Sequence, residues 1–144
     1  MTSPDDAPRS VPTGQLLRSL VLQDITLRHI QAECLVKALP ADAHVNHTLT
    51  GPTIVVESSG EIAFEHVLNL AVLTSDNTQL GALHIVMVCT YQCTDVPGLN
   101  AAELQKYTPS SIIHVWPYLR ELVSRTTADF GWPRLTLPTY NANL

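Results

Sequence analysis

Charge is scarce in this chain of 144 residues, and positive charge is scarcest. Lys and Arg number 8 against 13 Asp and Glu, which gives a formal net charge of −5 at pH 7. A surface of that sign repels phosphate groups, so we do not expect the protein to bind nucleic acid. No stretch of roughly 18 apolar residues is present to cross a bilayer, and no basic start leads into an apolar core as in a secretory signal. We therefore expect a cytoplasmic protein without direct membrane insertion.

Cysteine is also rare, and the three present do not predict a disulfide framework. Cys89 and Cys93 are four positions apart on a predicted strand, which separates them by roughly 13 Å, too far for one bridge. Reduced thiols are favoured, and these two cysteines then act as small hydrophobic side chains in the core.

The overall composition predicts one folded domain. Apolar residues make up 45% of the chain and charged residues only 15%, a balance too hydrophobic for intrinsic disorder. The length suits a single compact domain. Residues 1–13 contain three prolines among polar residues and little that is apolar, which predicts a mobile N-terminal tail. We assign residues 14–144 to the single domain.

Two segments carry clear strand patterns. Residues 62–72 place an apolar residue or His at every second position, which predicts a half-buried strand. Residues 81–94 predict a second long strand that is apolar on both faces, so both faces must be covered, by a helix and by a neighbouring subunit or a client. The short polar link between the two predicts an antiparallel hairpin.

The segments before this hairpin are less regular. Residues 45–49 predict a short strand that ends at Gly51-Pro52. Residues 15–39 fit neither period: 16–22 could be helical, whereas 24–28 alternate like a strand.

A helix and an extended end follow the hairpin. Asn100 is placed to cap a short helical turn at 101–106. Thr108 is placed to cap a main helix that runs to about residue 130, with Pro117 in its interior. Prolines in residues 132–138 forbid a further helix and predict an extended segment over the core. The sum is an α+β domain in which a helical layer packs on a meander of antiparallel strands.

No catalytic or metal-binding constellation emerges. His44 and His47 are a close pair, but a zinc site needs third and fourth ligands that no spacing supplies. His66 and His84 lie within the predicted strands without any motif of a nucleophile, a general base or a phosphate loop beside them. We therefore expect neither an enzyme nor a bound metal or cofactor.

The last third of the chain resembles the SecB family of export chaperones. The run WPYLRELVS at 116–124 and the run WPRLTLPTYN at 132–141 match that family's aromatic-Pro-Tyr-x-Arg-Glu helix and its aromatic-Pro-x-Leu-x-Leu-x-Pro segment in order and spacing. The resemblance implies a four-stranded antiparallel sheet with a long helix on one side, assembled as a dimer of dimers. The family's second C-terminal helix is expected to be largely missing here.

The resemblance also implies a function and a groove. SecB-like proteins are holdases without a cofactor, which bind non-native polypeptides in apolar grooves and pass them to the SecA motor. Ordinary core packing is the alternative role for each groove position. On the family pattern, the client-binding positions are Val96, Leu99, Ile112, Trp116, Trp132, Leu135 and Leu137.

The face that would dock a partner departs from the family pattern. Arg28, four positions after Asp24, and His84 stand where acidic residues are usual, so docking of SecA is altered. One alternative is a dedicated chaperone of an antitoxin in a toxin–antitoxin system. Alternatives from other classes are a small-ligand-binding or enzymatic α+β domain with its pocket between helix and sheet, and a purely structural oligomer subunit.

Overall fold

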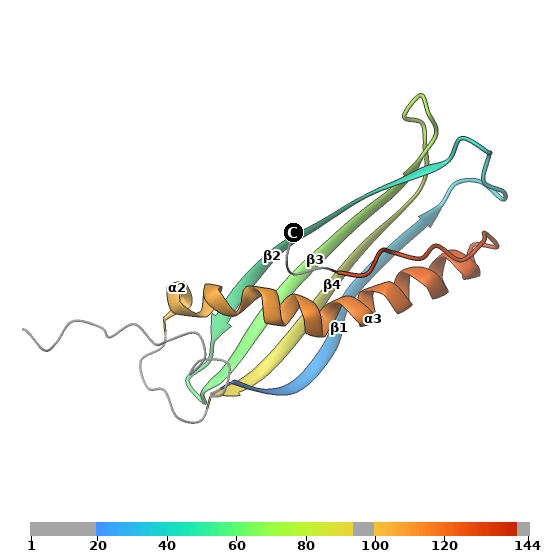
Figure 1. Ribbon diagram of the computed structural model, residues 1–144. Coiled ribbons are helices and arrows are strands. Elements are labelled where there is room, and N and C mark those ends of the chain that lie inside the picture. Colours follow the sequence, from blue (N-terminus) through green and yellow to red (C-terminus); the bar gives the residue numbers. More distant parts are fainter. Residues whose placement is uncertain (1–19, 94–99, 141–144) are drawn as a thin grey trace, which may run out of the picture.

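The structure, a computed structural model, describes residues 20–93 and 100–140 (Figure 1). The predicted tail at 1–13 and the predicted groove residues Val96 and Leu99 lie outside the described residues. Four antiparallel strands form one sheet in the order β1-β4-β3-β2. They are β1 (Leu20–Cys34), β2 (His44–Val56), β3 (Glu61–Leu73) and β4 (Gln79–Cys93).

The predicted hairpin is confirmed, but the meander holds for only three strands. β2, β3 and β4 follow one another, and the turn after β3 includes Asn77 in the left-handed region. β1 lies beyond β4, at the opposite edge from β2, so the expectation of a simple meander is wrong for the first strand. Alternation of apolar residues reports the face of a strand, not its partner, and this is why the sequence did not reveal the order.

Strand β1 resolves the ambiguity of residues 15–39. Its pairing with β4 shifts at two bulges, between Leu22 and Asp24 and between Leu27 and His29. Each bulge adds one residue and so moves the apolar phase by one position. As a result its inward-facing residues are spaced by two and three in turn, which imitates a helical period. They are Leu20, Leu22, Ile25, Leu27 and Ile30.

Strand β2 does not end at Gly51-Pro52 as predicted. The strand runs on to Val56, and the dipeptide forms a bulge between Thr50 and Thr53. Gly51 has φ +101, and a Cβ there would lie 2.8 Å from the Glu65 carbonyl oxygen, so glycine is required by both conformation and space. A proline is tolerated because β2 is an edge strand, where a missing N–H need not break the sheet.

The helical layer consists of α2 (Ala101–Leu104), a 3₁₀ turn η1 (Gln105–Tyr107) and α3 (Thr108–Asp129). The predicted cap at Asn100 is confirmed, because its Oδ1 accepts the Glu103 N–H at 2.9 Å. Thr108 does not cap α3, since η1 leads directly into that helix and Tyr107 holds the cap position without a side-chain bond. The helix continues through Pro117.

The chain reverses after α3 and runs back beside it (Figure 1). Gly131 makes the reversal with φ +83, and residues 133–140 form neither helix nor strand, as predicted. We call residues 132–140 the C-terminal strap. The strap and α3 cover the same face of the sheet, which we call the inner face; the opposite face is the outer face (Figure 1).

The hydrophobic core lies between the inner face and this layer. Alternate residues of β3 and β4, such as Phe64, Leu68 and Ile85, are fully buried there against Val115 and Leu119 of α3. The buried positions of α3 recur every three or four residues, which keeps one stripe on the sheet. The helical layer covers β1 less completely, and Leu22, Leu27 and Ile30 of this strand remain 38%, 40% and 38% exposed.

Candidate functional site

The histidines of the described residues do not gather into one cluster. His44 and His47 are three positions apart on β2, so their side chains leave opposite faces of the strand. His47 is on the inner face, with its ring centroid 6.1 Å from that of Trp116. Within residues 20–93 and 100–140, no group of three His, Cys, Asp or Glu residues could hold a metal ion.

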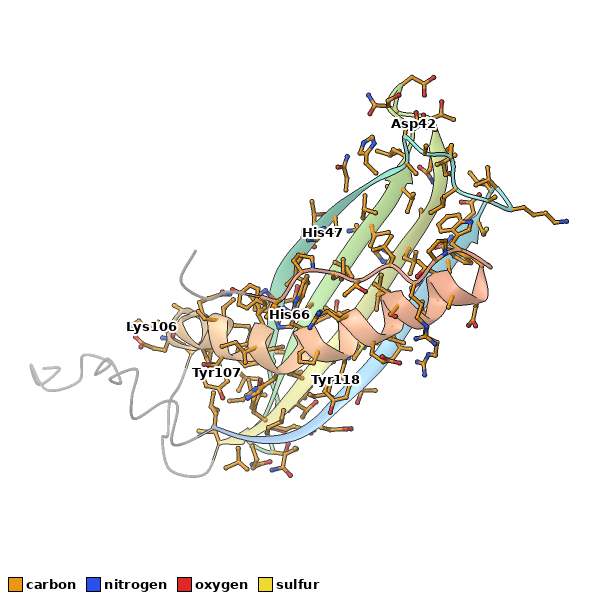
Figure 2. All side chains as sticks on the ribbon, turned by 45° about the vertical axis from the view of Figure 1, so that its right-hand side comes forward. Asp42, His47, His66, Lys106, Tyr107 and Tyr118 are labelled. Carbon is orange, nitrogen blue, oxygen red and sulfur yellow. The ribbon has the colours of Figure 1, made fainter. Side chains whose placement is uncertain are left out.

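His66 is buried between β3 and the first turns of α3 (Figure 2). Ser111 Oγ donates to the Thr108 carbonyl at 2.8 Å, so it accepts a hydrogen bond from His66 Nε2–H at 3.0 Å. His66 Nδ1 is then the unprotonated nitrogen, and among the described residues it has no partner. Burial lowers the pKa of His66 from 6.5 to about 4, so the ring is neutral at pH 7. His66 is therefore a core histidine that is held by a side chain of α3.

The C-terminal strap is held by side chains of α3 that contact its main chain. Trp116 Nε1–H donates to the Pro138 carbonyl at 2.8 Å, and Arg120 Nε–H donates to the Leu137 carbonyl at 2.9 Å. The Leu135 N–H donates to Thr127 Oγ1 at 3.0 Å. Successive members of the set Trp116, Arg120 and Thr127 are about one and two helical turns apart, so they form a row along the helix that faces the strap.

Side chains of the strap cover part of the inner face of the sheet. Trp132 donates its indole N–H to the Val36 carbonyl at 3.0 Å and packs on Gly81, where a Cβ would lie 2.5 Å from the indole ring. Leu137 is 1% exposed, and the Tyr140 ring centroid lies 6.1 Å from that of Trp116. The strap therefore completes the core.

The structure places four of the five described members of the predicted client-binding set, Trp116, Trp132, Leu135 and Leu137, in or against one hydrophobic core cluster. Trp116, Trp132 and Leu137 are buried, and Ile112 and Leu135 are half-buried. All five belong to α3 or the strap. The four in the cluster pack within the domain, and contact of any of the five with a client stays a proposal.

The three predicted partner-docking residues share the outer face. Asp24 pairs in register with Thr90, and His84 Nδ1–H donates a hydrogen bond to Asn69 Oδ1 at 2.6 Å. Arg28 forms an ion pair with Glu65 of β3 that reaches across the intervening strand β4.

Two hollows were not apparent from the sequence. One, of about 580 Å³, lies on the outer face and is lined by all four strands, among them Gln31, Asn46, Asn69 and His84. The other, of about 270 Å³, lies where Tyr118 of α3 points toward β1 (Figure 2). Tyr118 is 53% exposed. Only the tertiary structure forms these hollows, because the first combines residues of four strands and the second combines β1 with Tyr118 of α3.

Comparison with solved structures finds this architecture in a SecB-like chaperone. The SecB-like chaperone Rv1957 of Mycobacterium tuberculosis, solved in complex with a ChAD peptide from the antitoxin HigA1 (Rv1956), superimposes with a TM-score of 0.82. The two chains are 17% identical over 90% of this chain and 96% of the other. The chain therefore has the SecB-like α+β fold, as the resemblance in its last third implied.

Other comparisons add little. A protein of unknown function from Streptococcus agalactiae is 10% identical, covers 83% of this chain and 97% of its own, and has a TM-score of 0.41, too low to support an inference. No family model and no curated protein matches the sequence. Across the part of the chain that the structure describes, no helix is long and apolar enough to cross a membrane.

Proposed function

We propose that this protein is a cytoplasmic, ATP-independent chaperone of the SecB type, a holdase that binds non-native polypeptides and keeps them soluble. The observation that carries the proposal is the superposition on a SecB-like chaperone over nine-tenths of the chain. Exposed apolar side chains support it, such as Leu22 of β1 and Tyr118 of α3, which line one hollow, because contiguous apolar surface marks interaction sites. No enzymatic activity and no cofactor belong to the proposal.

The test is light scattering from an aggregating unfolded protein with and without this chain. The expected result is suppression at near-stoichiometric amounts in the absence of nucleotide, because a holdase acts by binding alone. Ovalbumin at equal mass controls for non-specific protein effects. A chain that leaves aggregation unchanged would contradict the proposal and favour a small-ligand or structural role.

A second candidate function is that of a dedicated chaperone for an antitoxin. The solved structure of Rv1957 with an antitoxin peptide favours it, and so does the outer face. The ion pair of Arg28 with Glu65 neutralises one negative charge on this face. The face is therefore less negative than one with acidic residues at positions 28 and 84, and it attracts a cationic partner less strongly. An export role requires SecA to bind the outer face around Asp24, Arg28 and His84. Failure of purified SecA to bind at low ionic strength would favour the antitoxin role.

We also propose that β1 is covered by a second copy of the chain, within a dimer or a dimer of dimers. β1 is an edge strand of 15 residues with unpaired backbone groups, and three of its inward-facing apolar side chains are more than one-third exposed. Replacing Ile30 by Lys should reduce the mass in solution, measured by light scattering after gel filtration. Thr26→Lys, on the outer face of the same strand, is the matched control. An unchanged mass in the Ile30 variant would place the interface elsewhere.

A further inference from the structure

Side chains of α3 hold the strap by its backbone, as a binding site holds an extended peptide. The three hydrogen bonds from Trp116, Arg120 and Thr127 all reach main-chain atoms of the strap, at Pro138, Leu137 and Leu135. Contacts of this kind recognise an extended backbone whatever its side chains are. Affinity then comes from apolar side chains that enter the core, and the strap supplies these at 132, 135, 137 and 140.

The strap can leave without breaking a strand ladder. Among the described residues, positions 133–140 make no backbone–backbone hydrogen bond. Pro133, Arg134 and Thr136 are exposed, so one side of the strap faces solvent. Release of residues 132–140 therefore breaks the side-chain bonds from α3 and the two bonds of Trp132, from its indole to the Val36 carbonyl and from its N–H to the Thr127 carbonyl. It uncovers an apolar floor, which an incoming apolar segment would cover again.

Building on the proposed holdase function, we propose that the strap occupies a client-binding site and that clients compete with it. The occupant is an extended polypeptide segment with an aromatic residue followed by large aliphatic residues three and five positions later, as in Trp132, Leu135 and Leu137. Trp116, Arg120 and Thr127 hold its backbone. Because the strap is tethered to the site, it lowers the apparent affinity of every client and rejects those that bury too little apolar surface.

The test measures binding of a fluorescently labelled peptide, GWPRLTLPTY, which repeats residues 131–140, to the full-length chain and its variants by fluorescence anisotropy. Leu137→Ala weakens the strap but leaves the site intact, so the peptide should bind this variant about tenfold more tightly than the wild-type chain. Thr139→Ala, at an exposed strap position, is the matched control and should bind as the wild-type chain does. A peptide with Ser in place of both leucines should not bind.

A second substitution tests the contact with the backbone. Added to Leu137→Ala, Arg120→Met should lower the affinity for the peptide about fivefold, because one main-chain bond is lost. Arg125→Met, an exposed position on the same helix, is its control. If Leu137→Ala does not fold, Tyr140→Ala replaces it, with a smaller gain expected because Tyr140 is only half-buried.

The outcomes separate this inference from the proposed function. Equal peptide affinity in the wild-type and strap variants, or no binding to either, overturns the inference and makes the strap a permanent part of the core. If the wild-type chain still suppresses aggregation in that case, the holdase function stands by itself. A gain in peptide affinity without any suppression of aggregation supports the site and overturns the holdase.

Discussion

The two faces of the sheet differ although the same strands build both. On β3, Phe64 and Leu68 point inward and are fully buried, whereas the neighbouring Glu65 and Asn69 point outward into an ion pair and a hydrogen bond. Even the outer face has apolar members, Val86 and Val88, which its flanking side chains bury. The comparison indicates that the inner face supplies most of the stability of the domain, while the outer face is more polar and carries a hollow.

The largest expected effect tests where the stability lies. Phe64 is 0% exposed, and its ring packs edge-on against Tyr91 and Tyr107 with centroids 5.3 Å and 5.8 Å away. Phe64→Ala should lower the free energy of unfolding by about 3–5 kcal/mol, because it removes apolar contacts and leaves a cavity. Val67→Ala, on the outer face of the same strand, should cost about 1 kcal/mol or less. Urea unfolding measures both, and equal losses would contradict the comparison.

The next effect concerns the dependence of stability on pH. Since the pKa of His66 is about 4 when folded and 6.5 ordinarily, the unfolded chain binds the extra proton between these values. The stability of the fold is therefore unaffected by protonation of this ring above pH 6.5. As the pH falls from 6.5 toward 4, protonation of His66 in the unfolded chain lowers the free energy of unfolding by about 3 kcal/mol in all. In His66→Leu, the free energy of unfolding should depend less steeply on pH between 6.5 and 4.

A matched variant sharpens that measurement. His84→Leu removes one imidazole from the outer face and serves as the control for the His66 variant. Chemical unfolding of both at several values between pH 7 and pH 4 gives the slopes. A His66 variant with the wild-type slope would show that burial of this ring does not govern acid sensitivity.

The smallest expected effect is on the outer face. Arg28 and Glu65 have side chains that are 58% and 29% exposed, so solvent screens their ion pair. Arg28→Met should change the free energy of unfolding by only about 0.5 kcal/mol. A double-mutant cycle with Glu65→Gln isolates the pair, and a coupling energy several times larger would mean that the outer face also stabilises the fold.

Much of the fold was predictable where one period governs a segment. Strands β3 and β4, their hairpin, the Asn100 cap and the extended strap all follow from local patterns in the chain. The main helix and its bounds were also predicted to within a residue, but its cap was not, because η1 runs directly into α3 and Tyr107 holds the cap position. The failures came where a strand departs from regular pairing, at the two bulges of β1 and at Gly51-Pro52 in β2.

The site shows the same division. The motif residues Trp116, Trp132 and Leu137 were singled out from the sequence, and the structure places them together. Nothing in the sequence indicated that Arg120 and Thr127 would bond to the strap backbone, since such contacts depend on which segment returns beside the helix.

By itself, the sequence determined the fold class, the strongly periodic elements and the family resemblance, because these depend on spacing along the chain. Only the tertiary structure decided that β1 pairs with β4, that Arg28 reaches Glu65 and that the strap closes over the inner face. Each of these joins residues distant in sequence, and their pairing is set by packing and by hydrogen bonds that no local pattern encodes.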